Sequence, residues 1–164
     1  MSRARLGFVA ALAVVLAAPA RAVMLEAPFE EIVASSDLVV KGKVTSLESR
    51  FVDPATRFIV TDVTLQVDEV WSGTVGANRT VTFTVNGGVV DGLGMRQSHQ
   101  PVFVPGEETV VFLKATTEAR LAVNYAEQGK FTVSGDVVIG FKQLPIPLQR
   151  LRGDVSRLKP VRTR

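Results

Sequence analysis

Histidine and cysteine supply most catalytic nucleophile and base sets and most zinc sites, and this chain has almost none of them. It contains one histidine, His99, and no cysteine. A Ser-His-acid set would have to use His99, and the adjacent Ser98 is not expected to face it. A zinc site needs several converging nitrogen or sulfur ligands. The sequence therefore predicts neither a catalytic triad nor a zinc centre.

Carboxylates are the remaining candidates for acid–base or metal chemistry. Asp62 and Asp68 fall on one face of a predicted strand, but six residues of extended chain separate them by about 20 Å. Glu107 and Glu108 are adjacent, so in a strand they point to opposite faces. No EF-hand spacing occurs. We expect a protein that is not an enzyme, with no catalytic, cofactor-binding or metal-binding residue and no cofactor.

Glycines and prolines between residues 87 and 105 mark the best candidate for an interaction surface. The segment lacks the Lys-Ser/Thr pair of a phosphate-binding loop, so its glycines are interpreted as turn residues. We expect a turn at Asn86-Gly87-Gly88 and a long loop over residues 92–106, and loops of this length are often functional. An ordered lid over the end of the core is the alternative. The candidate binding residues are Gly87, Gly88, Met95, His99, Pro101 and Phe103.

Alternating apolar side chains predict the strands that position this loop. The clearest strands span residues 57–71 and 80–86. A further strand over 37–47 contains Gly42, which favours a bulge or bend. Shorter strands are predicted at 109–113, 121–125, 130–133 and 137–141. This spacing is typical of an all-β barrel or sandwich.

Two helices are expected to flank the strands. Residues 27–36 begin with Pro28 and acidic residues, which favours a short helix. After Pro145, apolar side chains recur at helical spacing and predict an amphipathic helix, which Gly153 weakens. These apolar residues are Leu148, Leu151, Val155 and Leu158.

The first 22 residues have the pattern of a secretory signal peptide. Arg3 and Arg5 precede an apolar run over residues 6–18, and Ala20-Arg21-Ala22 offers a cleavage site. The run is shorter than the roughly 20 residues that span a membrane. We expect a secreted or periplasmic protein without a transmembrane segment in the mature chain. The predicted regions are a signal peptide (1–22), a β domain (23–145) and a basic amphipathic helix with a tail (146–164).

Charge is distributed unevenly along the predicted mature chain. Removal of the signal leaves sixteen basic and sixteen acidic residues. Residues 149–164 carry a net charge of +5, so the preceding part carries −5. An acidic body does not suit a nucleic-acid partner. The basic tail is expected either to dock on the body or to contact an anionic surface.

Several short sequence segments resemble those of a known protein family. They are SDLVVKGKV (36–44), VTLQVDEVWSG (63–73), FVPGEE leading into VVFL (103–113) and GKF (129–131). Together they resemble a group of secreted bacterial proteins that look like the netrin-module and tissue-inhibitor-of-metalloproteinase class of OB-fold. The resemblance covers roughly residues 29–133. It implies a mainly β protein with an OB-like barrel of five to six strands, a short N-terminal helix and a C-terminal amphipathic helix.

The resemblance implies fold more than function. The tissue inhibitors present an N-terminal cysteine to the zinc of a protease, and this chain has no cysteine, so no functional residue carries over. We expect an exported, non-enzymatic binding module whose partner is an exported protein such as a protease. The alternative is a structural module of the cell envelope whose basic tail contacts anionic lipid or polysaccharide.

Overall fold

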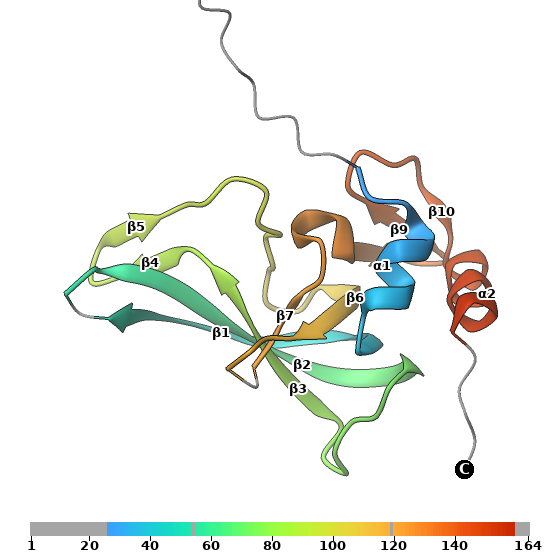
Figure 1. Cartoon of the computed structure of the whole chain (residues 1–164), viewed down its shortest axis with the longest axis horizontal. Coiled ribbons are helices and arrows are strands. Elements are labelled where there is room, and N and C mark those ends of the chain that lie inside the picture. Colours follow the sequence, from blue (N-terminus) through green and yellow to red (C-terminus); the bar gives the residue numbers. More distant parts are fainter. Residues whose placement is uncertain (1–25, 54, 119, 160–164) are drawn as a thin grey trace, which may run out of the picture.

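A computed structural model describes residues 26–53, 55–118 and 120–159 of the chain. It confirms a mainly β protein with one short helix before the strands and another after them (Figure 1). In chain order the elements are α1 (Phe29–Ser35), β1 (Leu38–Asp53), β2 (Phe58–Ser72), β3 (Thr80–Asn86), β4 (Gly88–Val90), β5 (Leu93–Met95), β6 (Glu108–Ala115), β7 (Leu121–Val123), the 3₁₀ turn η1 (Ala126–Gly129), β8 (Lys130–Ser134), β9 (Val137–Gly140), β10 (Ile146–Pro147) and α2 (Leu148–Leu158). The predicted signal peptide (1–22) and the tail beyond residue 159 lie outside the described residues.

Eight strands form one sheet whose pairings return to their starting strand. β1 pairs antiparallel with β2 on one edge and with β6 on the other, and β2 pairs antiparallel with β3. β7 joins β3 to β6, through one parallel pair (Thr84 with Ala122) and an antiparallel ladder. The order is therefore β1-β2-β3-β7-β6 and back to β1, with β8, β9 and β10 continuing from β6.

Gly42 bends β1, as the sequence predicts. The pairing register with β2 shifts between Lys41 and Gly42. A Cβ atom at Gly42 would lie 2.4 Å from the carbonyl oxygen of Gln66, so only glycine allows this approach. β1 runs on to Asp53 and not only to residue 47, because its polar second half continues to pair with β2.

The apolar side chains form two core clusters on opposite faces of β6. Val111 and Leu113 point into one cluster with the inward side chains of β2 and β3. Val110 and Phe112 point into the other, with both helices and Trp71. The apolar run Val110–Leu113 therefore lies in a strand that is buried on both faces. Trp71 is 3% exposed and Phe83 is 1% exposed, so both large aromatic side chains are buried.

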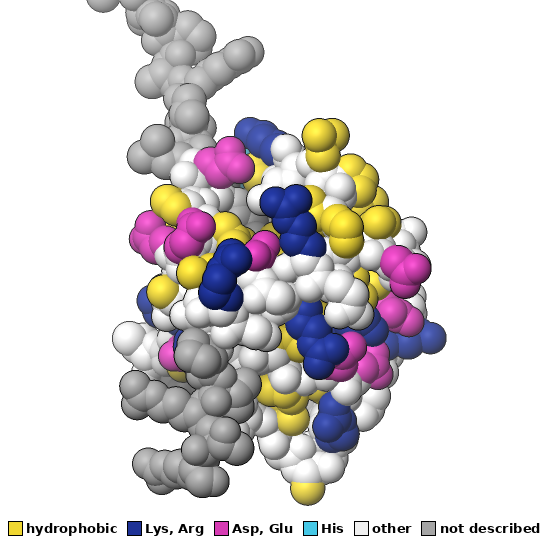
Figure 2. All heavy atoms as spheres, turned by 90° about the vertical axis from the view of Figure 1, so that its right-hand side faces the viewer, with side chains coloured by type: hydrophobic (Ala, Val, Ile, Leu, Met, Phe, Trp, Pro, Cys, Tyr) yellow, Lys and Arg dark blue, Asp and Glu magenta, His cyan; other side chains and the backbone are white. Residues whose placement is uncertain are grey.

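The C-terminal helix α2 docks on the β body. Leu151 and Val155 are buried in the second cluster. Arg152 Nη1 lies 3.2 Å from Glu69 Oε2, and Lys159 donates a hydrogen bond to the carbonyl oxygen of Ser36. On the face that carries α2, basic side chains are interspersed with acidic and apolar ones (Figure 2).

Two loop predictions are wrong in part. The chain does not reverse at Asn86-Gly87-Gly88 but passes from β3 into β4, and the predicted loop over 92–106 begins with β5. The reversal occurs at Asp91 and Gly92, whose φ angles of 50° and 76° suit a tight hairpin turn. The predicted strand at 121–125 ends at Val123, because Tyr125 adopts a left-handed conformation that starts η1.

Candidate functional site

A cleft of about 600 Å³ lies between the β4–β5 hairpin, the segment that follows it, and strands β1, β2 and β3. We call it the hairpin cleft. Its volume falls within the range of ligand sites in proteins. The apolar side chains that line it are Leu47, Val63, Val85, Val89, Met95, Pro101, Val102 and Phe103. The polar ones are Ser49, Thr61, Asn86, Gln97 and Gln100, and among the described residues Arg96 is the one charged side chain of the lining.

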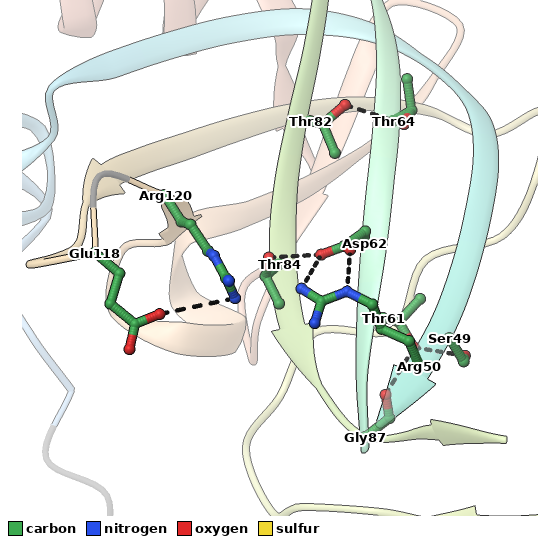
Figure 3. Close-up of polar contacts among 10 residues, drawn as sticks. All are labelled: Ser49, Arg50, Thr61, Asp62, Thr64, Thr82, Thr84, Gly87, Glu118 and Arg120. Carbon is green, nitrogen blue, oxygen red and sulfur yellow. Dashed lines mark hydrogen bonds and ion pairs between the residues drawn. The ribbon is translucent and has the colours of Figure 1, made fainter. Parts of the chain in front are cut away.

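Two glycines and a pair of hydroxyl groups fix the start of the hairpin. Gly87 and Gly88 have φ angles of 102° and 140°. A Cβ atom at Gly88 would lie 2.4 Å from the side-chain oxygens of both Ser49 and Thr61. Thr61 donates a hydrogen bond to the carbonyl oxygen of Gly87 (2.7 Å), so Ser49 donates to Thr61 (2.9 Å) (Figure 3). Glycine is therefore required where the hairpin meets β1 and β2.

A partly buried ion pair anchors the opposite wall of the cleft. Lys130 Nζ lies 2.8 Å from Glu107 Oε1, and the two side chains are 11% and 15% exposed. Lys130 also donates to the carbonyl oxygen of Val102 and lies 4.5 Å from the ring centroid of Phe103. Phe103 packs edge-on against Phe83, with 5.2 Å between ring centroids. These contacts hold the segment that carries Phe103 over the first core cluster.

Five of the six predicted binding residues line the cleft, and His99 does not. Gly87, Gly88, Met95, Pro101 and Phe103 come together there. His99 Nδ1 instead lies 2.9 Å from Glu127 Oε1, and the Glu127 N–H donates to the His99 carbonyl oxygen at 3.1 Å. His99 therefore ties the loop to η1.

Sequence reasoning missed the strand residues of the lining and the hairpin itself. The alternation of side chains identifies Leu47, Val63 and Val85 as core positions. They line a cleft only because the β4–β5 hairpin lies beside them. The Asp91-Gly92 pair between apolar residues is a strong hairpin signal, and it would have located the fold of this segment.

A second, smaller recess lies on the outer face of β2 and β3 (Figure 3). Arg50 Nε donates to Asp62 Oδ2 at 2.7 Å, and Thr84 donates to Asp62 Oδ1 at 2.7 Å. Partial burial acts to raise the pKa of Asp62, but the bonds from Arg50 and Thr84 and the charges of Arg50 and Arg120 hold the pKa below its ordinary value. The hydrogen bond to Asp62 raises the pKa of Arg50. Asp62 therefore stays ionised and engaged, which suits a structural ion pair better than a general base.

Within residues 26–53, 55–118 and 120–159, no group of three or more histidine or acidic side chains could hold a metal ion. None of the described helices is long and apolar enough to cross a membrane. Compared with known proteins, the chain matches no family model, no curated protein and no solved structure.

Proposed function

We propose that this chain is an exported, non-enzymatic binding module that holds a segment of another exported protein in the hairpin cleft. The observation that carries the proposal is the continuity of the apolar lining with exposed apolar side chains at the mouth. Val89 and Val102 line the cleft and are still 66% and 64% exposed. Leu93, on the same hairpin, is 39% exposed. Exposed apolar patches of this kind mark interaction sites.

A protein partner fits this surface better than a small molecule. The tip of the β1–β2 hairpin carries Val52 and Phe58, which are 50% and 39% exposed. This tip projects from the same end of the molecule as the β4–β5 hairpin (Figure 1), and β4 contacts both β1 and β2. A small molecule within 600 Å³ would leave these outer side chains in water, whereas a partner chain would cover them.

The proposed fold is an OB-like barrel of the netrin-module and tissue-inhibitor class. The cyclic order β1-β2-β3-β7-β6 supports it, since an OB-fold is a partly open five-stranded barrel. The signal-peptide pattern supports export, and the resemblance suggests a protease as the kind of partner. The protease partner is proposed by analogy with that class, because one fold hosts many functions.

The hairpin cleft is favoured over the basic C-terminal helix as the surface that binds the partner. Arg152 pairs with Glu69, and Arg157 pairs with Asp154 at 2.7 Å. These ion pairs reduce the charge that α2 offers to anionic lipid or polysaccharide.

A variant that adds bulk at the cleft tests the proposal. Gly94 and Val89 both line the cleft, and a Cβ atom at Gly94 meets only the Val89 side chain at 3.9 Å, so Gly94→Phe adds a ring beside Val89 without a backbone clash. Gly153→Phe is the matched control, because Gly153 is exposed on α2 and a Cβ atom there meets nothing within 4 Å. The immobilised wild type and both variants are exposed to the exported proteins of the producing cell.

We expect one retained protein, identified by mass spectrometry, that Gly94→Phe loses and Gly153→Phe keeps. Retention that is unaffected by Gly94→Phe, or no retained protein with the wild type, would overturn the proposal. Substrate turnover that His99→Ala abolishes would also overturn it, because it would identify an enzyme.

A further inference from the structure

The lining of the hairpin cleft also indicates the chemistry of its occupant. Resting on the proposed function, we propose that the occupant is an extended peptide segment in which an acidic side chain neighbours apolar ones. The apolar side chains enter the cleft beside Met95 and Phe103, and the carboxylate pairs with Arg96. The free edges of the hairpin and the charge of the lining support this occupant independently.

The free edges of the β4–β5 hairpin favour an extended peptide. β4 and β5 form a sheet of their own, and neither outer edge has a strand partner within the described chain. Gly94 and Met95 belong to β5 and line the cleft, so strand backbone borders the binding space. An extended segment adds to such an edge by main-chain hydrogen bonds, while its alternate side chains enter pockets.

The charge of the lining favours an acidic occupant. Arg96 follows β5 directly, and every other lining side chain is apolar or neutral. In the part of the chain that the structure describes, Arg96 makes no hydrogen bond or ion pair, whereas Arg50 is paired with Asp62 and Arg79 donates to the carbonyl oxygens of Val67 and Asp68. An unpaired guanidinium beside apolar surface is well placed for a charge-assisted pair with a carboxylate.

The amide side chains around the cleft support the same occupant. Gln97, Gln100 and Asn86 line the cleft with neutral amide groups, and Gln100 Oε1 accepts a hydrogen bond from the Asn86 N–H at 3.4 Å. Such groups match the backbone of a bound peptide, and they add no charge that would compete with Arg96 for the carboxylate.

A random peptide library tests the inference. Twelve-residue peptides displayed on phage are selected on the exported protein produced from the full chain, and the enriched peptides are then measured by titration. We expect enriched sequences with Asp or Glu beside apolar residues, and binding that Gly94→Phe abolishes. Arg96→Gln should weaken these peptides about tenfold, in line with the loss of one charge-assisted pair. Arg96→Lys should restore much of the binding.

The control and the outcomes separate this inference from the proposed function. Arg150→Gln removes an exposed arginine on α2, away from the β4–β5 hairpin, and should leave binding unchanged. Peptides that need an open cleft but carry no acidic residue would overturn this inference alone. Peptides that Arg96→Gln and Arg150→Gln affect equally would overturn it as well. If Gly94→Phe weakens the binding of none of the enriched peptides, the proposal that the cleft binds a protein segment is refuted, and this inference is refuted with it.

Discussion

Replacement of Lys130 by methionine tests whether a partly buried ion pair holds the wall of the hairpin cleft. Methionine keeps most of the length and apolar character of the lysine stem but removes the charge. Glu107 then keeps only the hydrogen bond that its carboxylate accepts from the Val104 N–H at 3.0 Å. The Lys130 side chain is 11% exposed and that of Glu107 is 15% exposed, so the remaining carboxylate has lost its cation in a largely dry position.

The expected loss of stability follows from this burial. Removal of one partner of a buried ion pair costs about 3–5 kcal/mol. The residual exposure and the retained Val104 bond favour the lower end, about 3 kcal/mol. For a chain of this size, that corresponds to a fall in melting temperature of roughly 10 °C. Peptide binding in the cleft should weaken as well, because Val102 and Phe103 lose their contacts with the ammonium group.

The measurement is thermal and urea unfolding followed by the fluorescence of Trp71, which is buried in the second core cluster. Lys114→Met is the matched control, because Lys114 is exposed on β6 and should change stability by less than about 0.5 kcal/mol. Addition of Glu107→Gln to Lys130→Met should recover part of the loss, since the uncompensated charge is then absent. Equal effects of Lys130→Met and Lys114→Met, or no recovery in the double variant, would refute the reasoning.

Three further substitutions test other parts of the structure. Gly153→Ala should raise the free energy of unfolding by about 0.5–1 kcal/mol, measured by urea denaturation, because an exposed glycine inside α2 becomes alanine in open space. Asn124→Ala should lower it by about 2 kcal/mol, because its buried amide nitrogen hydrogen-bonds the C-terminal end of α1, where the Ile32 carbonyl oxygen and the hydroxyl oxygens of Ser35 and Ser36 lie 2.8–3.2 Å away. An unchanged midpoint would contradict this role. The depressed pKa of Asp62 means that its ionised form stabilises the fold above about pH 4 and that this contribution is lost as the pH falls through the folded-state pKa. Asp62→Asn should therefore flatten the fall in melting temperature between about pH 5 and pH 2, and an unaltered acid profile would contradict that assignment.

The sequence predicted the strands whose side chains alternate and missed the elements that depend on tertiary contacts. Residues 80–86 alternate without interruption, and β3 has those bounds. The second half of β1 has no such alternation, and its strand state comes from pairing with β2 up to Asp53. β10 has only two residues, Ile146 and Pro147, and exists through its pairing with β9.

The sequence predicts a loop as the candidate site. In the structure most of its candidate residues line a cleft, and strand residues of β1, β2 and β3 form the floor of that cleft. Loop composition drew attention to residues 87–105, and five of the six named residues lie in the lining. The floor could not be predicted, because Val63 and Val85 have the same alternation whether a strand side chain faces core or cleft. His99 lies outside the lining because it pairs with Glu127 in η1, a partner 28 positions away that the sequence does not indicate.

Three contacts within the chain hold the walls of the hairpin cleft in place. Thr61 fixes the hairpin at Gly87, His99 ties the following loop to η1, and Lys130 fixes the segment that carries Phe103. Binding to a preformed site loses less conformational entropy than binding that orders a loop. The exposed apolar side chains Val89 and Val102, together with Arg96, then determine which segment binds. Variants of the three anchors should therefore lower affinity for all ligands alike, whereas variants of Arg96 should change the preference between acidic and neutral ones.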